Sequence, residues 1–515
     1  MKEELLGLFD KEEFSQSQIP LVVFDLANNH NGDVGHGLNI IREISKTCEE
    51  FREDFIFGFK FQYRDLESFI HPDYKGRTDI KYLRRFSETR LTNLEFELMK
   101  DEIEKLGFVS VCTPFDESSV DLIEKQKFEI IKVASCSFTD WPLLERIVKT
   151  DKPIIASTAG ATINEIDRVS AFFLNRDKKF CLMHCVAEYP TKNENLHLNQ
   201  IALLKNRYKG INIGYSTHEN PDNVNSIKLA IGMGASIFER HVALGENRNA
   251  YSATPEQVKL WLKSAKESFE MLGKKERICV TEKEEENLRG LRRAVFANRN
   301  IKAGERVNTG KVFYAIPSLE QQVLANDMSK YIHYYAQRDI GEKEPILLRD
   351  LRVVDTREEI KRIYHDIKER LIEANLPLPE IIDLELSHHY GINRFYEFGC
   401  AMINVINRDY CKKFILVLPG QTNPMHEHRL KEESFIVDQG DVSVNIDGVE
   451  KEYKKGDVIL VRTGVRHSFT SRNGGIFEEI STTHYKNDSY YGDERITGNP
   501  ERKTYIKIWL NDRKD

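Results

Sequence analysis

Hydrophobic positions in the first 270 residues form short continuous runs rich in β-branched and aromatic residues. Amphipathic stretches such as LTNLEFELMKDEIEKLG separate these runs. Apolar strands that alternate with helices are typical of a parallel sheet. Eight strands are predicted, at residues 21–30, 55–62, 108–116, 129–137, 153–160, 180–189, 210–218 and 235–242. Eight βα units in about 250 residues favour a (β/α)8 TIM barrel over a doubly wound sheet, the alternative for residues 1–275.

The pattern changes after this region. Segments 294–307 and 334–347 both contain A-x-R-x-I followed by glycine and glutamate. The repeat predicts a small β domain at 285–352, with chance similarity of two turns as the alternative. In the following linker, 353–389, Thr356 and Glu359 predict a capping box. The apolar face of the linker helix would be formed by Ile360, Ile363, Ile367 and Leu371.

Short β-rich runs separated by turn sequences predict a third folded region, a β-barrel or sandwich at 390–490. This leaves 491–515 as a C-terminal tail. The net charge of −7 does not fit a nucleic-acid or membrane-surface binder. With no run of 18 apolar residues, no signal peptide and no CxxC pair among eight cysteines, we expect a cytoplasmic protein with free thiols.

Polar residues gather at the predicted C-terminal ends of the barrel strands, where TIM barrels place catalytic groups. Scattered polar loop residues are the alternative. Lys60 and Lys132 could hold a phosphate or carboxylate dianion together with nearby hydroxyl groups. His218 and His241 end neighbouring strands and could share a divalent metal that polarises a carbonyl, although a structural hydrogen-bonding role is the alternative for either histidine alone. The full set is Asp25, Asn29, His30, Asn31, Lys60, Gln62, Thr113, Lys132, Ser135, Ser157, Thr158, His184, Glu188, Tyr189, Ser216, His218, Glu239 and His241.

The segments NNHNG, KFQ, CTPFDESSVD, IKVAS, KPIIAST, HCVAEYPT, GYSTH and FERH resemble the sialic acid (N-acetylneuraminate) synthase family. The resemblance continues into the repeated β domain, which is similar to the antifreeze-like (SAF) domain of that family. It implies a C–C bond-forming transferase that condenses phosphoenolpyruvate with an aldose. The expected products are a nonulosonic (sialic-acid-like) or related 3-deoxy-ulosonic acid and phosphate. The partners implied are these two substrates and a second copy of the chain, in a homodimer with or without domain swapping.

The same resemblance assigns roles to individual residues. The catalytic set would be Asp25, Lys60, Lys132, His218 and His241, with Mn²⁺ or Mg²⁺ held by the two histidines. Lys60, Lys132, Thr113, Ser135, Ser157 and Ser216 would bind phosphoenolpyruvate. Other substrate contacts would be Gln62, Glu188 and Tyr189, with Asn249 and Tyr251 in the segment NRNAYSATP.

Four departures from the family pattern stand out. Asp25 replaces a glutamate, Ala187 replaces an asparagine or serine, residues 247–255 replace the acidic PGPDH segment, and residues 312–322 contain no counterpart of the family's arginine. Three of these lie on the sugar side. We therefore expect an acceptor sugar other than N-acetylmannosamine.

Residues 420–440 have the spacing G-x₅-H-x-H-x₄-E-x₆-G, and 456–471 supply two glycines and His467. These stretches resemble the two motifs of a cupin, with Arg462 and Ser471 as departures in the second. The resemblance makes His426, His428, Glu433 and His467 ligands of a second metal, either Mn, Fe, Ni, Co or Zn. A charged hairpin is the alternative.

The cupin leaves several functions open. A metal-dependent sugar isomerase that feeds an aldose to the barrel would use Glu478 or Glu479 as the proton carrier. A sugar-binding or dimerising cupin without activity is a second possibility. For the whole chain, the alternatives to the synthase are a cupin-centred isomerase or epimerase with a drifted barrel, and a non-catalytic sugar-acid-binding scaffold.

Overall fold

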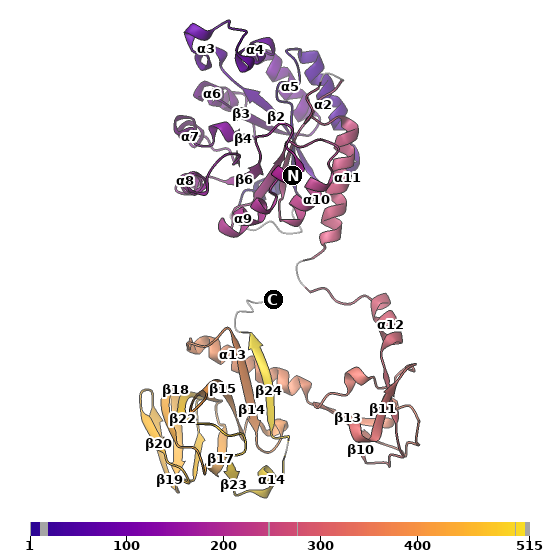
Figure 1. Ribbon diagram of the computed structural model, residues 1–515, viewed down its shortest axis with the longest axis vertical. Helices are drawn as coiled ribbons and strands as arrows, with labels where there is room; N and C mark the ends of the chain where they lie inside the picture. The colour runs from indigo at the N-terminus through magenta and orange to yellow at the C-terminus, as the bar shows by residue number, and fades with distance from the viewer. Residues whose placement is uncertain (1, 11–18, 246–247, 275–276, 500, 510–515) are drawn as a thin grey trace. The chain divides into compact units, whose positions relative to one another are not determined.

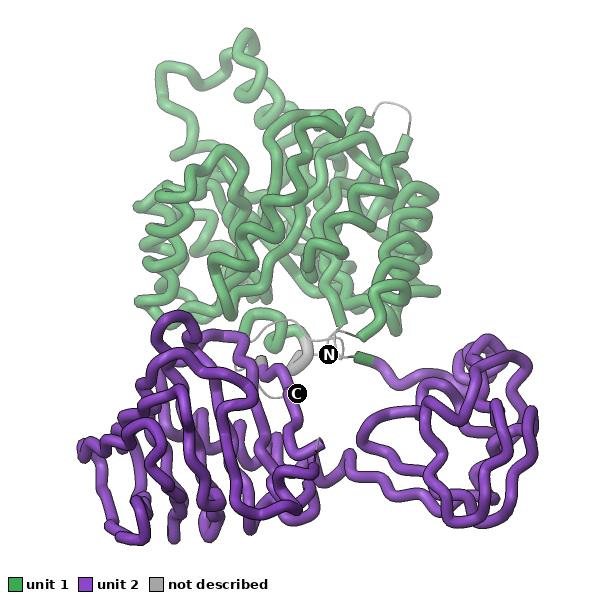
Figure 2. Tube along the Cα trace, turned by 60° about the horizontal axis from the view of Figure 1, so that its bottom comes forward, with its two compact units in different colours: residues 1–277 green, residues 278–515 purple. Residues whose placement is uncertain are grey.

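The computed structural model describes residues 2–10, 19–245, 248–274, 277–499 and 501–509, which Figure 1 shows in chain order. The chain divides into two compact units, residues 1–277 and 278–515, coloured separately in Figure 2. Among the described residues, the first unit holds all the parallel strands. The second holds antiparallel sheets and, in its described part, two helices of ten residues or more.

The first unit is a closed barrel of eight parallel strands in chain order (Figure 1). β1 pairs with both β2 and β8, which closes the sheet and confirms the TIM barrel over the doubly wound alternative. The strands are β1 (Leu21–Asp25), β2 (Ile56–Tyr63), β3 (Val109–Pro114), β4 (Ile130–Val133), β5 (Ile154–Ser157), β6 (Phe180–Cys185), β7 (Ile213–Thr217) and β8 (Ile237–His241).

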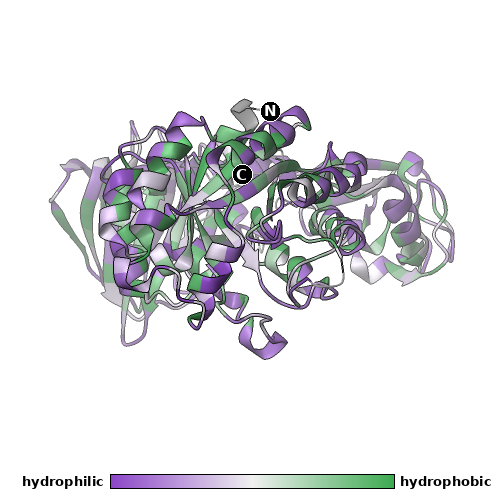
Figure 3. Cartoon of the chain, turned by 90° about the horizontal axis from the view of Figure 1, so that it is seen from above, coloured by the Kyte–Doolittle hydropathy of each residue, from purple (hydrophilic) through white to green (hydrophobic). Residues whose placement is uncertain are grey.

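Helices surround the barrel, and Figure 3 shows hydrophilic residues along them. Three of them begin with a capping box, at Thr92, Thr162 and Thr254, in which each threonine hydroxyl accepts from the backbone N–H three residues later. The helices are α1 (Lys2–Gly7), α2 (Val34–Cys48), α5 (Asn93–Lys105), α6 (Glu117–Lys125), α7 (Trp141–Ile147), α8 (Ile163–Leu174), α9 (Asn199–Arg207), α10 (Asn225–Gly232) and α11 (Pro255–Leu272).

Strand alternation divides the barrel's apolar residues into two cores. Outward-facing side chains such as Phe24, Phe59 and Leu182 pack beneath the helices, whereas inward-facing ones such as Val23 and Met183 fill the barrel interior. The interior core lies toward the amino ends of the strands. The carboxyl ends are therefore left to the polar side chains described below.

One excursion departs from the regular βα pattern. Between β2 and α5 the chain forms α3 (Leu66–Phe69), a 3-10 turn (Pro72–Tyr74) and α4 (Lys81–Glu88). These short helices lie near α5 and α6 in Figure 1. The excursion follows directly after the strand end that carries Lys60 and Gln62.

The second unit begins with α12 (Glu282–Leu291) and a small group of strands. These are β9 (Ala294–Ala297), β10 (Arg306–Val307), β11 (Val312–Ala315), β12 (Ile332–Ala336) and β13 (Leu351–Asp355), in two small antiparallel sheets. The two similar segments found in the sequence meet where Ile301 forms a β-bridge with Ile340. Both isoleucines are buried in the core of this group.

The linker helix α13 (Arg357–Ala374) buries Ile360, Ile363, Ile367 and Leu371, as its periodicity predicts. The predicted capping box at Thr356 is wrong. The Thr356 hydroxyl makes no cap and instead donates to the Tyr331 carbonyl oxygen at 2.8 Å. The Thr356 hydroxyl therefore bonds to the residue just before β12 and does not cap α13.

The remaining strands form one curled antiparallel sheet, the fold expected of a cupin. It extends past the predicted range of 390–490, because β14 and β24 pair at its edge. Residues 503–509 are therefore a strand and not a tail. The strands are β14 (Ile381–His388), β15 (Gly399–Asn407), β16 (Tyr410–Val417), β17 (Thr422–Glu427), β18 (Glu433–Ile446), β19 (Val449–Lys454), β20 (Val458–Val461), β21 (His467–Thr470), β22 (Gly475–Thr482), β23 (Tyr490–Tyr491) and β24 (Lys503–Trp509), with α14 (Glu494–Thr497) before the last. Among the described residues, none of the helices has the length and hydropathy needed to cross a bilayer.

Three buried histidines make stability depend on pH. Burial lowers the pKa of His30, His388 and His389 from 6.5 to about 4. Between these values the unfolded chain binds protons that the folded chain does not. The free energy of unfolding should therefore fall as pH drops from 6.5 to 4, by up to about 1.4 kcal/mol per pH unit for each histidine. Denaturant unfolding at pH 7 and pH 5 measures this, and equal stabilities would contradict it.

Candidate functional sites in the barrel and the cupin

Two buried lysines share one carboxylate at the centre of the barrel. Lys60 on β2 and Lys132 on β4 are 4% and 2% exposed. Glu239 on β8 lies 3.0 Å from each Nζ and also accepts from the Ser216 hydroxyl at 3.0 Å. A buried carboxylate between two ammonium groups offsets their desolvation. Sequence reasoning placed Glu239 among the strand-end polar residues but gave it no role. The sequence pattern could have indicated a role for Glu239, because strand alternation puts Glu239 and His241 on the same face of β8.

The two lysines have different electrostatic environments. Burial opposes the charge of Lys60, but Asp25 and Glu239 together raise its pKa above the ordinary value. Burial lowers the pKa of Lys132, which has Glu239 as its carboxylate partner and feels repulsion from Lys60. Lys132 is therefore the less compensated cation of the pair. An anion bound beside Lys132 would supply the negative charge that this lysine lacks.

Asp25, the last residue of β1, connects the lysines to the histidines. Its Oδ2 lies 3.0 Å from Lys60 Nζ and 3.3 Å from His241 Nδ1, and it accepts from Gln62 Nε2 at 3.2 Å. Burial opposes its charge, yet the Lys60 ammonium holds its pKa below the ordinary value. Asp25 is thus a charged carboxylate held by Lys60 and Gln62 beside the His241 ring.

His218 and His241 lie at the ends of β7 and β8 with their ring centroids 5.3 Å apart. His218 Nδ1 is 2.8 Å from the Val186 carbonyl oxygen. Burial lowers the pKa of His241 to about 4, so its ring is neutral, the state that a metal ligand requires. Tyr189 and Tyr251 pack against this pair, with centroids 4.4 Å from His218 and 5.1 Å from His241.

Two of the predicted hydroxyl ligands have no partner. Thr113 Oγ1 and Ser157 Oγ are buried, and neither makes a hydrogen bond among the described residues. Ser135 Oγ accepts from the Ala159 backbone N–H at 3.2 Å. Unpaired buried hydroxyls are costly. Their place on the same barrel rim as Lys60 and Lys132 suits an oxyanion that would accept from them.

Two other predicted substrate contacts, Glu188 and Asn249, make hydrogen bonds to residues of the barrel loops. The Glu188 carboxylate accepts from Asn195 Nδ2 at 2.9 Å, within its own loop. Asn249 Nδ2 donates to Asn29 Oδ1 at 3.2 Å, which ties the segment after β8 to the loop after β1. Tyr189 is 54% exposed, so one side of its ring faces solvent at the barrel mouth.

The cupin brings three histidines together. His426, His428 and His467 each offer a ring nitrogen within 4.8 Å of the other two. In each ring Nδ1 lies against a backbone carbonyl oxygen, of Pro424, Asp488 and Val465 respectively. A ring that donates through Nδ1 leaves Nε2 deprotonated and available as a ligand.

Glu433, the fourth predicted ligand, lies beside this cluster. Its Oε2 is 3.1 Å from His467 Nε2, yet neither atom makes a hydrogen bond among the described residues. Two buried acceptor atoms facing each other in this way fit a cation placed between them. The residues present therefore match a divalent metal with nitrogen and oxygen ligands.

A chain of buried charges continues from Glu433. Lys431 Nζ binds both Glu433 and Glu479, the latter at 3.0 Å, and Lys413 Nζ lies 3.4 Å from Glu479. The neighbouring Glu478 pairs with Lys412 at 2.8 Å and is partly exposed. Alternation along β22 thus points Glu479 inward and Glu478 outward. Glu479 is the interior carboxylate, and two lysines hold it.

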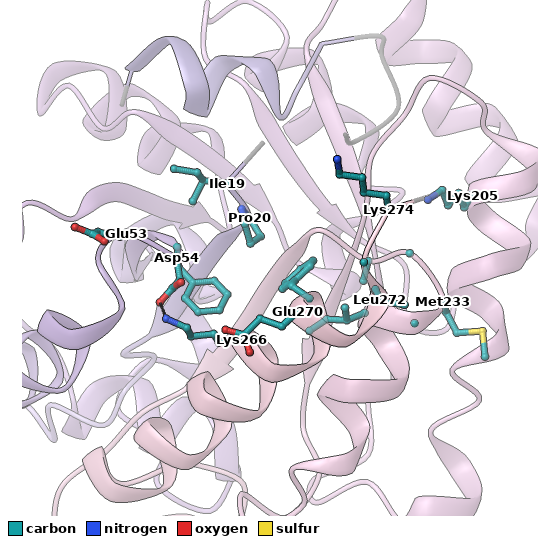
Figure 4. Close-up of a pocket in the computed structure, with 17 residues that line it drawn as sticks. Ile19, Pro20, Glu53, Asp54, Lys205, Met233, Lys266, Glu270, Leu272 and Lys274 are labelled. Carbon is teal, nitrogen blue, oxygen red and sulfur yellow. Dashed lines mark hydrogen bonds and ion pairs between the residues drawn. The ribbon is translucent and has the colours of Figure 1, made fainter. Parts of the chain in front are cut away.

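One cavity lies away from this chemistry. It has a volume of about 660 Å³ and lies at the amino ends of β1, β2 and β8, where Ile19, Pro20 and Phe55 line it (Figure 4). Lys266 and Asp54 form an ion pair of 2.8 Å in its wall. The catalytic groups of TIM barrels lie at the opposite ends of the strands. The polar cluster at the carboxyl ends is therefore the candidate active site.

The chain is similar to known proteins along most of its length. Residues 54–277 match the NeuB family model, and residues 413–477 match the Cupin domain model. An uncharacterized protein of Methanocaldococcus jannaschii is 32% identical over 56% of this chain and 82% of its own length. The N,N'-diacetyllegionaminic acid synthase of Campylobacter jejuni is 26% identical over 57% of this chain and 89% of its own. The crystal structure of a candidate spore coat polysaccharide biosynthesis protein E from Chromobacterium violaceum is 51% identical, covers 65% of this chain and 99% of that one, and has a TM-score of 0.63. This chain therefore belongs to the NeuB family and carries a cupin domain in its second unit.

Proposed function

We propose that the barrel condenses phosphoenolpyruvate with an aldose to give a nonulosonic or related 3-deoxy-ulosonic acid and phosphate. One observation carries the proposal. Lys60 and Lys132 meet at the barrel centre, with Thr113 and Ser157 as unpaired hydroxyls on the same rim and two histidines beside them. This set supplies an oxyanion pocket next to a candidate metal pair.

In this reaction the two lysines and the hydroxyl groups bind the phosphate and carboxylate of phosphoenolpyruvate. Glu239 keeps both ammonium groups charged and in place. C3 of phosphoenolpyruvate forms the new bond to the aldehyde carbon, water adds at C2, and the C2–O bond to phosphate breaks. Asp25, held by Gln62 and Lys60, lies 3.3 Å from His241 Nδ1 and would orient the His241 ring. A divalent cation bound by His218 and His241 would polarise the aldehyde as a Lewis acid.

The aromatic pair at the mouth has a supporting role in this proposal. Tyr189 and Tyr251 have ring centroids 5.1 Å apart and pack over the two histidines. A bound sugar would lie against these rings, which exclude water from the aldehyde. By resemblance, residues 285–352 form a SAF domain, and the working unit is a homodimer.

The test is the release of inorganic phosphate from phosphoenolpyruvate with Mn²⁺ across a panel of aldoses and ketoses. We expect release that requires an aldose, with N-acetylmannosamine not the best acceptor by kcat/KM. Release that is equal with and without sugar would contradict the synthase. The best acceptor would also name the product.

For the cupin, we propose a second divalent metal site. The supporting observation is that Nδ1 of each of the three histidines lies against a backbone carbonyl oxygen, which leaves each Nε2 available to a metal. A feeding ketose–aldose isomerase is one use of such a site. The position of Glu479 between Lys413 and Lys431 weighs against it as a free proton carrier. A sugar-binding cupin fits these contacts better.

Replacing His467 with alanine is expected to remove about one bound metal ion per chain, because it breaks the cluster of three imidazoles and removes the ring nitrogen that faces Glu433 Oε2. Equilibrium dialysis with Mn²⁺ or Zn²⁺ and elemental analysis measures the stoichiometry. His365→Ala, on the exposed side of α13, is the matched control. An unchanged stoichiometry in His467→Ala would remove the proposed cupin site.

A further inference from the structure

A second cavity adjoins the barrel mouth at the end of β2. It has a volume of about 420 Å³ and lies where the β2–α5 excursion meets α5 and α6. The residues that line it include Gln62, Arg64, Asp65, Phe86, Arg90 and Asp121.

Arg64 is the central cation of this cavity. Its guanidinium lies between two aromatic rings, 4.2 Å from the Phe86 centroid and 3.5 Å from the Phe115 centroid. One of its nitrogens donates to Gln62 Oε1 at 3.2 Å, while the buried Nε has no hydrogen-bond partner among the described residues. Burial lowers the pKa of Arg64 to about 10, which marks a desolvated cation with little compensation.

The carboxylates that line the cavity are already engaged. Asp65 caps α3 and accepts from the Ser68 hydroxyl at 2.7 Å. Asp121 pairs with Arg146 at 2.6 Å. Arg90 reaches Glu67 at 3.4 Å, and both of those side chains are more than half exposed. Arg64 is therefore left as a fixed positive group with no carboxylate of its own in the cavity wall.

One side chain lies between this cavity and the candidate active site. Gln62 accepts from Arg64 on one side and donates to Asp25 on the other, and Asp25 in turn lies 3.3 Å from His241 Nδ1. A sugar whose aldehyde lies near the histidines could thus extend past Gln62 toward Arg64. A planar guanidinium held between two rings is well suited to a carboxylate or a phosphate monoester.

We propose that the cavity at Arg64 binds an anionic substituent of the acceptor aldose, a carboxylate or a phosphate monoester, at the end remote from the aldehyde. This inference rests on the proposed synthase function. It names the substrate class that the departures on the sugar side leave open. The acceptor is an acidic sugar, and Arg64 is its specificity-determining residue.

The test compares three acceptors on each of two sugar skeletons: the neutral aldose, its 6-phosphate and its uronic acid. The parent should prefer one of the two anionic forms by kcat/KM, and which one identifies the substituent. In Arg64→Gln the KM for that acceptor should rise by about 10- to 100-fold, the range for losing a charged hydrogen bond. The KM for phosphoenolpyruvate and for the neutral sugar should not change. Arg64→Lys keeps the charge without the planar guanidinium, so its KM for the anionic acceptor should lie between those of the parent and of Arg64→Gln.

Arg84→Gln, on the exposed side of α4 and outside the cavity, is the matched control and should behave as the parent. A neutral aldose as the best acceptor would overturn the inference, as would equal KM increases for neutral and anionic sugars. Calorimetry without phosphoenolpyruvate tests the Arg64 site separately from the reaction. It compares the affinities of the parent and of Arg64→Gln for the sugar 6-phosphate and for the uronic acid. Equal affinities there would refute the Arg64 site. Phosphate release that responds to no sugar would instead refute the synthase.

Discussion

Replacing His218 with alanine is expected to lower kcat for aldose-dependent phosphate release by at least about 10³-fold. The change removes one of the two neighbouring imidazoles at the ends of β7 and β8. Lewis-acid polarisation of a carbonyl contributes several kcal/mol, and each 1.36 kcal/mol corresponds to about a tenfold change in rate. Steady-state kinetics with saturating Mn²⁺ and both substrates measures the effect.

His36→Ala is the matched control for this prediction, because His36 lies on α2 and is partly exposed. It should retain the activity of the parent. If His218→Ala keeps more than about a tenth of the parent kcat, which corresponds to less than about 1.4 kcal/mol, the histidine pair does not take part in the reaction.

Replacing Glu239 with glutamine is expected to lower the free energy of unfolding by about 3–5 kcal/mol, the usual cost of removing one partner from a buried ion pair. The variant leaves Lys60 and Lys132, both almost fully buried, without the carboxylate that lies 3.0 Å from each. Denaturant unfolding of the full chain measures the loss. The change is nearly isosteric, so packing contributes little.

The same variant gives a second readout. An oxyanion bound at the two lysines would replace the missing negative charge, so phosphate or phosphoenolpyruvate should raise the unfolding midpoint of Glu239→Gln more than that of the parent. Glu188→Gln, which changes a carboxylate bound only within its own loop, is the control. If the ligands stabilise Glu239→Gln no more than the parent, the anion pocket is not at these lysines.

The barrel could be predicted from the sequence because each strand is a short, mostly apolar run whose polar residues gather toward its carboxyl end. Once the strands are located, the period of two fixes which side chains face inward, and this places Lys60, Lys132 and His241 around one centre. The cupin histidines follow from the same rule, since His426 and His428 are two residues apart. These parts of the sites needed only local information.

Other features depend on contacts between distant segments. The Thr356 hydroxyl donates to Tyr331, 25 residues away, so a local capping rule fails there. Pairing of β14 with β24 joins residues near 385 and 505, which no local pattern indicates. Arg64 becomes a half-buried cation only because Phe86 and Phe115 pack against its guanidinium from different parts of the chain. The carbonyl groups that orient the cupin histidines are likewise backbone atoms whose positions the sequence does not reveal.

The central claim is that the barrel joins phosphoenolpyruvate to an aldose. The most direct measurement is the mass of the product, with the amounts of phosphoenolpyruvate and aldose consumed and of phosphate released in the same reaction. We expect equal molar amounts of phosphoenolpyruvate consumed, aldose consumed and phosphate released. We also expect one new acid, whose mass equals the masses of the two substrates plus that of water minus that of phosphoric acid. Phosphate released with pyruvate as the carbon product, or phosphoenolpyruvate left intact with every aldose, would contradict it.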